Sequence, residues 1–125
     1  MAAQTRSLHP AAVFAIDLVL VLVFLLIGRT THGEPFLEGL VGSAWPFVVG
    51  LVVGWAVILL TRTPSTSVLA GGMAWFATLV IGMVLRVASG GTAAVPFIIV
   101  ATITLAVFLI GWRLILLLVN RRRRS

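Results

Sequence analysis

Four long apolar segments, separated by short breaks, constrain this chain more than any other feature. They cover residues 11–28, 44–60, 68–85 and 95–119. At ~1.5 Å per residue in a helix, the first three are roughly 25–27 Å long and the fourth about 37 Å, against a bilayer hydrocarbon core of ~30 Å. Each break contains arginine together with glycine or proline, as expected where helices end. The pattern predicts an all-α, polytopic membrane protein in which residues 1–125 form a single domain, a compact bundle of four transmembrane helices.

The composition excludes a water-soluble fold. Of the 125 residues, 61% are hydrophobic and 10% are charged, and the mean hydropathy is +1.21, whereas about a quarter of the residues in a soluble domain are charged. A chain of this length has too little interior to hide so much apolar surface from water. Because cysteine is absent, disulfides, thiolate metal sites and cysteine nucleophiles are excluded as well.

The net charge of +6 comes from arginine alone, because the chain contains no lysine. Nucleic-acid binding is not expected, since the charge is not spread along a soluble face. Four of the nine arginines instead follow the last apolar segment: Arg121, Arg122, Arg123 and Arg124. We expect residues 120–125 to form a basic cytoplasmic tail that anchors the protein at anionic lipid headgroups.

The distribution of arginine also predicts the orientation in the bilayer. The cytoplasmic ends of membrane helices carry an excess of lysine and arginine. If both termini are cytoplasmic, that side holds Arg6, Arg62 and the four tail arginines, whereas the opposite side holds only Arg29 and Arg86. Six arginines against two favour this orientation, and we expect a multi-pass protein of the plasma membrane.

A weak internal similarity relates the two halves of the chain. Each half has an arginine at the outer end of its first helix, a Pro-Phe pair early in its second helix and a Gly-Trp pair later in that helix. Two transmembrane helices per half would give a parallel repeat of two helical hairpins. Because chance matches are common among apolar residues, duplication and coincidence both stay open.

Small residues recur on the second and third helices at intervals of four. Since lipid tails are as apolar as leucine, membrane helices associate through close backbone packing at such residues. The positions are Gly50, Gly54, Ala70, Ala74, Thr78 and Gly82. We expect them to pack helices within one chain, and the seam of a homodimer is the alternative.

The four tryptophans and Leu51 carry further expectations. Trp45 and Trp112 lie near helix ends, as interfacial tryptophans do, whereas Trp55 and Trp75 lie deeper and are assigned to packing. Leu51, on the same helix as the paired glycines, is expected to face a looser environment.

Asp17 is the only acidic residue inside an apolar segment, roughly 9 Å from its cytoplasmic end. Intramembrane carboxylates are costly, by about 2.5–3.5 kcal/mol on insertion scales, and usually mark an ion path or a paired charge. Arg113 reaches a similar depth from the same side. We therefore predict an ion pair between Asp17 and Arg113 in the cytoplasmic half of the bundle. Two alternatives are a proton or cation site at Asp17 and an Arg113 side chain that extends to the headgroups.

A second polar cluster is expected at the outer end, where Arg29, His32 and Arg86 lie near Glu34 and Glu38. Arginines at helix C-termini interact favourably with the helix dipole, and the glutamates can pair with them. The alternative is an outward-facing anion site, with His32 able to titrate near physiological pH.

No catalytic motif accompanies these residues. The chain contains no H-E-x-x-H, no G-x-S-x-G and no phosphate-cradling loop. His9 and His32 flank the first helix on opposite sides of the bilayer, so one subunit cannot use both for one metal or haem. We expect no enzymatic activity, no metal and no cofactor.

A family resemblance runs through most of the chain. The residues that carry it, in order, are Asp17, Phe24, Gly28, Arg29, His32, Trp45, Pro46, Phe47, Gly50, Trp75, Thr78, Gly82, Met83, Arg86, Gly90, Gly111, Trp112 and Arg113. This series resembles the domain-of-unknown-function family 3054, which comprises small four-helix membrane proteins of bacteria and archaea. The resemblance implies a four-span fold and a plasma-membrane location, and it implies no activity.

Two functions follow from these observations. The first is a small oligomeric transporter or channel for a small solute or ion, with Asp17 on its path. Four transmembrane helices leave little room for a pore within one chain, so this function would require a homodimer or a larger assembly. The second is a non-catalytic accessory or assembly subunit that packs against a larger membrane complex.

Overall fold

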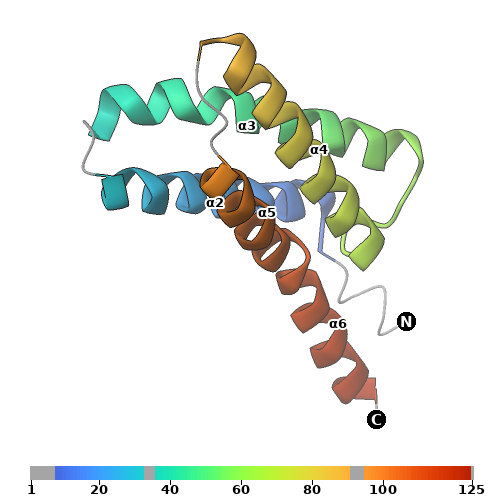
Figure 1. The fold of residues 1–125 in the computed structure, drawn as a ribbon. Coiled ribbons are helices and arrows are strands. Elements are labelled where there is room, and N and C mark those ends of the chain that lie inside the picture. The colour runs from blue at the N-terminus through green and yellow to red at the C-terminus, as the bar shows by residue number, and fades with distance from the viewer. Residues whose placement is uncertain (1–7, 33–35, 91–94, 125) are drawn as a thin grey trace.

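The computed structural model describes residues 8–32, 36–90 and 95–124, with side chains described for residues 8–27, 44–90 and 95–122. Every regular element in these ranges is a helix (Figure 1). The helices are α2 (Pro10–His32), α3 (Phe36–Leu60), α4 (Val68–Ala88), α5 (Val95–Leu109) and α6 (Gly111–Arg124). The prediction of an all-α fold is confirmed.

The last two elements, α5 and α6, form one nearly continuous helix. The Ile110 N–H donates to the Ala106 carbonyl at 3.0 Å, and the Leu114 N–H donates to the Ile110 carbonyl at 3.0 Å. The four-residue spacing of a helix is thus kept across the junction. The described chain therefore has four helices, as the four apolar segments predict.

The four helices pack in a ring. Chain neighbours contact one another in turn, and α5 closes the ring by packing against α2, while α3 and α4 share the most extensive contact. The start of α2, the turn between α3 and α4, and the end of α6 lie at one end of the molecule (Figure 1). This end is called the basic end below, because Arg62, Arg121 and Arg122 lie there.

The first two helices are longer than their apolar segments. The sequence predicts the first two spans at residues 11–28 and 44–60, but α2 continues to His32 and α3 begins at Phe36. Arg29 and His32 therefore lie in the last turn of a helix, and the expected loop residue Glu38 lies within α3. Hydropathy predicts only the part of a helix that lies in the lipid. Backbone hydrogen bonding can continue the helix beyond that part. The side chains of residues 28–43 lie outside those described.

The end of α3 is closed by a left-handed residue. The Thr63 N–H donates to the Ile58 carbonyl and the Arg62 N–H to the Leu59 carbonyl, at 3.0 and 3.2 Å, which is the Schellman pattern. Arg62 has φ 57°, at a position where glycine is usual because it has no Cβ penalty. On the other side of the turn, Ser67 caps α4 by accepting the Ala70 N–H at 3.1 Å.

Glycines on α3 allow its close approach to α4. A Cβ built at Gly50 would lie 2.8 Å from the Ala77 carbonyl oxygen and 2.9 Å from the Thr78 Cα. A Cβ at Gly54 would lie 2.9 Å from the Ala77 Cβ and 3.3 Å from the Ala74 Cα. Both contacts are too short for any larger residue, so the two backbones meet at these positions. Gly50 and Gly54 thus pack α3 against α4 within one chain.

Aromatic rings pack together in the half of the bundle away from the basic end. Phe47 lies over Gly82, where a Cβ would be 2.5 Å from the ring. Phe24, Phe47 and Phe97 form a cluster with centroid separations of 6.1–6.3 Å. The expectation for Leu51 is wrong, because this side chain is 0% exposed. Leu51 belongs to a buried row with Phe47, Trp55 and Ile58, which follow one another at intervals of three or four along α3. The glycine spacing alone does not indicate this row.

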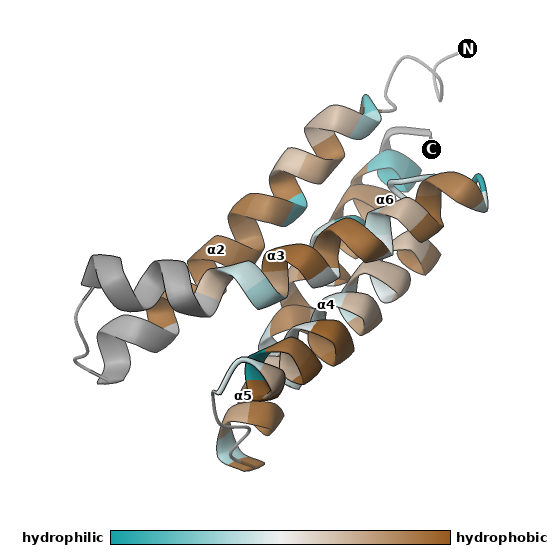
Figure 2. Ribbon diagram, turned by 90° about the horizontal axis from the view of Figure 1, so that it is seen from above, coloured by the Kyte–Doolittle hydropathy of each residue, from teal (hydrophilic) through white to brown (hydrophobic). Residues whose placement is uncertain are grey.

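The outer surface of the bundle is apolar. Three helical segments are long and apolar enough to cross a membrane: Pro10–Ile27, Val68–Ala88 and Val95–Arg122. The part of α3 whose side chains are described, Ala44–Leu60, is a shorter apolar segment. Hydrophobic residues follow the helices along most of their described length (Figure 2), and fewer than a third of the residues in the three longer segments are buried inside the bundle. Such a surface is compatible with a membrane protein, because monomeric soluble proteins rarely expose large apolar patches.

Candidate functional site

Asp17 and Arg113 form an ion pair inside the bundle. Arg113 Nη1 donates to Asp17 Oδ1 at 2.9 Å, and Nη2 donates to Oδ2 at 2.8 Å. Both side chains are 0% exposed. The two parallel bonds give the bidentate geometry in which a planar guanidinium matches a carboxylate. The structure thus brings together the two charged residues that the sequence predicts to pair.

Two tryptophans complete the coordination of the Asp17 carboxylate. The indole N–H of Trp55 on α3 donates to Oδ2 at 2.8 Å, and that of Trp112 on α6 donates to Oδ1 at 2.9 Å. Each carboxylate oxygen therefore accepts two hydrogen bonds, and a carboxylate has about four acceptor positions. The acceptor capacity of Asp17 is full.

The Arg113 guanidinium has further partners on the backbone. Its Nε donates to the Ser65 carbonyl in the turn between α3 and α4 at 2.9 Å, and its Nη1 also donates to the Leu109 carbonyl at 2.8 Å. Gly71 on α4 makes room for the side chain, because a Cβ there would lie 2.9 Å from the Arg113 Cδ. Through these contacts Arg113 links α6 to α2, to α4 and to the turn that follows α3.

We call Asp17, Trp55, Trp112 and Arg113 the polar latch. Its energetic meaning follows from its burial. Each charge alone would be expensive in an apolar interior, whereas a pair with all its hydrogen bonds made offsets much of that cost. Removing one partner of such a pair typically costs 3–5 kcal/mol, because the other charge is left uncompensated. The latch therefore holds the first, second and last helices in one arrangement.

Sequence reasoning missed the tryptophan donors. The sequence assigns Trp55 to packing, and its ring does pack edge-on against Phe14 with centroids 5.6 Å apart, but its N–H also binds the carboxylate. The sequence assigns Trp112 to the interfacial belt, whereas the structure shows its half-buried indole N–H bound to Asp17. The available signal was the need of a deep indole N–H for an acceptor, since Asp17 is the only acid in the apolar segments. Trp75, also assigned to packing, donates to the Thr102 carbonyl at 3.0 Å.

The expected outer cluster is described only in part. The side chains of Arg29 and His32 lie outside those described, so the predicted approach of Arg29 to Arg86 stays a prediction. Arg86 is half-buried, with its guanidinium carbon 4.6 Å from the centroid of the Phe97 ring, a cation–π distance. This contact joins Arg86 to the cluster of phenylalanines. An anion at Arg86 would have to bind alongside the Phe97 ring.

The remaining predicted residues divide between the helix contacts and the basic end. Ala70, Ala74, Thr78 and Gly82 are the residues predicted to pack on α4, and all four are buried. Arg121 and Arg122 are exposed, and α6 continues through Arg124, so the described part of the predicted basic tail is helical. The side chains of Arg123 and Arg124 lie outside those described.

The fold and the latch together define a class: a small all-helical protein whose helices are compatible with a membrane and are joined by a buried ion pair. The particular family follows from comparison with known proteins. The chain belongs to the family described as "Protein of unknown function (DUF3054)", whose family model matches residues 14–116. The matched range includes all four residues of the latch. No curated protein and no solved structure matches the chain.

Proposed function

We propose that this protein is a non-catalytic integral membrane protein that serves as an accessory or assembly subunit, with the polar latch as its structural centre. The observation that carries the proposal is the full coordination of Asp17. A carboxylate that binds a transported proton or cation needs a free acceptor position, and the four donors at 2.8–2.9 Å occupy all of them. Arg113 also repels any cation that approaches the carboxylate.

The exposed surfaces are consistent with this role. The small residues that would otherwise suggest a dimer seam are used between α3 and α4 of one chain. A partner would therefore contact other faces, such as those of α4 and α5 that carry Phe76, Val84 and Ile103, each about 60% exposed. These faces are apolar and without charge, as expected for contacts among membrane helices.

A transporter or channel is the second candidate, and the position of the latch favours it. The latch joins α2, α3 and α6 near the basic end, and ionisable groups inside membrane segments frequently line ion or proton paths. If the ion pair opened during a transport cycle, the helices at that end would be free to separate. This reading also requires a second copy or a larger assembly, because four helices leave little room for a pore.

Flux measurements and purification in mild detergent distinguish the two functions. The accessory reading predicts that proteoliposomes containing the protein conduct neither protons nor small cations above the level of protein-free vesicles. It also predicts that one partner co-purifies at constant stoichiometry. Flux that Asp17→Asn abolishes and Arg86→Gln preserves, with both variants folded, would replace it with the transporter reading.

The proposed topology has four spans with both ends cytoplasmic, in the plasma membrane. The uneven distribution of arginine supports the cytoplasmic orientation. The start of α2 and the end of α6 lie at one end of the bundle (Figure 2), which supports the placement of both ends on the same side. Single cysteines are easily placed in this cysteine-free chain. We expect an impermeant thiol reagent to label Leu37→Cys in intact cells and Thr66→Cys only after lysis. The reverse pattern would invert the topology.

The proposed repeat of two hairpins gains support from the latch. Trp55 and Trp112, which belong to the matching Gly-Trp pairs, donate to the two oxygens of one carboxylate. The buried positions of the first helix in each half also match. The number of residues that separates Trp55 from Trp112 also separates three buried positions of α2 from three of α4. The pairs are Val13 and Ala70, Asp17 and Ala74, and Val21 and Thr78, and all six residues are 0% exposed. In a parallel repeat, the Asp17 carboxylate lies near the axis that relates the halves.

A further inference from the structure

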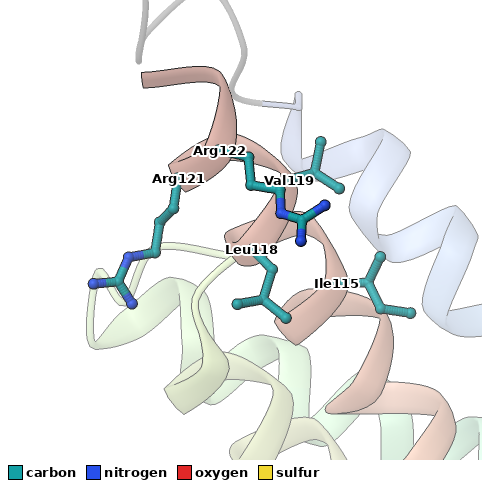
Figure 3. Close-up of a pocket in the computed structure, with 5 residues that line it drawn as sticks. All are labelled: Ile115, Leu118, Val119, Arg121 and Arg122. Carbon is teal, nitrogen blue, oxygen red and sulfur yellow. The ribbon is translucent and has the colours of Figure 1, made fainter. Parts of the chain in front are cut away.

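The last turns of α6 carry exposed apolar side chains next to exposed arginines. Ile115, Leu118 and Val119 are 64%, 58% and 42% exposed. Together with Arg121 and Arg122 they line an open hollow of about 520 Å³. Figure 3 shows the five side chains on this stretch of α6, with the guanidinium groups of Arg121 and Arg122 on different sides of the helix. One surface thus combines apolar side chains with two positive charges.

The depth of these residues matches the layers of a bilayer leaflet. On the basic side of the latch, α2 extends about 10 Å from Asp17 to its first residue, and α3 extends about 8 Å from Trp55 to its last. Along α6, the apolar residues of the hollow lie about 3–9 Å beyond Arg113 and the two arginines about 12–14 Å beyond it. The apolar part therefore lies between the level of the latch and the ends of the other helices, and the arginines lie just past those ends.

We infer that this hollow is a binding site for one anionic phospholipid. Its acyl chains cover Ile115, Leu118 and Val119, and its phosphate binds Arg121 and Arg122, whose exposed and flexible side chains turn toward it from the two sides of the helix. Arginine at headgroup level attracts negative lipids, and apolar side chains one or two turns deeper face the acyl chains. A free phosphate ion would use only the arginines and would leave the apolar part of the hollow exposed. The inference rests on the proposed location in a membrane, and it is independent of the choice between accessory subunit and transporter.

The experiment is a lipid titration of the full-length protein in a mild non-ionic detergent, with bound lipids counted by native mass spectrometry. We expect one saturable phosphatidylglycerol and no comparable binding of phosphatidylcholine. Arg121→Gln with Arg122→Gln should weaken phosphatidylglycerol roughly thirtyfold, at about fivefold for each arginine near an anionic headgroup. The matched control, Arg6→Gln with Arg62→Gln, removes the same charge from the end assigned to the cytoplasm and should change the affinity less than threefold.

Two further measurements test the apolar half of the site. Leu118→Asn should weaken phosphatidylglycerol at unchanged net charge, and glycerol phosphate should not compete with the lipid at equal concentration. If both double variants lost the same affinity for phosphatidylglycerol, the binding would depend only on net charge and the inference would be overturned. Equal binding of phosphatidylcholine, or effective competition by glycerol phosphate, would overturn it as well. Failure of the lipid site with an intact fold would leave the proposed function standing, because the latch and the hollow share no residue.

Discussion

Replacing Asp17 with asparagine and Arg113 with glutamine, singly and together, measures the strength of the polar latch. Either single substitution leaves one fully buried charge without its partner, and asparagine also brings N–H groups toward the donors of Trp55 or Arg113. We expect each single variant to lose about 3–5 kcal/mol of stability. The double variant leaves no charge unpaired, so it should be more stable than the sum of the single effects predicts, by about 2–3 kcal/mol.

The assay is equilibrium unfolding in mixed micelles, monitored by tryptophan fluorescence. Trp55 and Trp112 lie within the latch and contribute to this signal. A control cycle combines Asp17→Asn with Arg86→Gln. Arg86 lies fifteen residues beyond Gly71, which contacts Arg113, or about 22 Å further along α4. This control should be additive within about 0.5 kcal/mol. Equal additivity in the Asp17 and Arg113 cycle would refute the reasoning, because it would mean that the two groups do not interact when the protein is folded.

Three further predictions concern the surroundings of the latch and can be checked by the same unfolding measurement. Trp55→Phe and Trp112→Phe should each cost about 1–3 kcal/mol, because each leaves an oxygen of the buried carboxylate one donor short; no loss in either would show that the indole N–H groups are dispensable. Gly50→Ala should destabilise by about 1–3 kcal/mol, since its Cβ would meet the backbone of α4. Gly72→Ala, with nothing within 4 Å of the added carbon, should be neutral or stabilising. Arg62→Gly should stabilise by about 0.5–1 kcal/mol because φ 57° suits glycine, and a loss would indicate that the arginine side chain contributes more than its backbone strain costs.

Much of the fold can be predicted from the sequence because its determinants are local. Runs of apolar residues long enough to cross lipid must be helical there, since only helices and closed barrels satisfy all backbone hydrogen bonds. The small residues at intervals of four predict close helix contacts, because this spacing along the sequence places them on one face of a helix. The approach of Asp17 to Arg113 is likewise accessible, because depth in the bilayer follows from counting residues from the helix ends.

The tertiary structure decided everything that depends on rotation about the helix axes. Residue counting gives the depth of Trp55 and Trp112 but not the direction of their indole N–H groups, and that direction determines that Asp17 is saturated. The burial of Leu51 and the contact of Arg86 with Phe97 depend in the same way on which faces of neighbouring helices meet. The sequence by itself determined the helices, their approximate lengths and one charged pair at matching depth. Only the packed structure decided the donors of that pair and the exposed end of α6, because hydropathy and spacing are properties of one helix, whereas a hydrogen-bond network is a property of several.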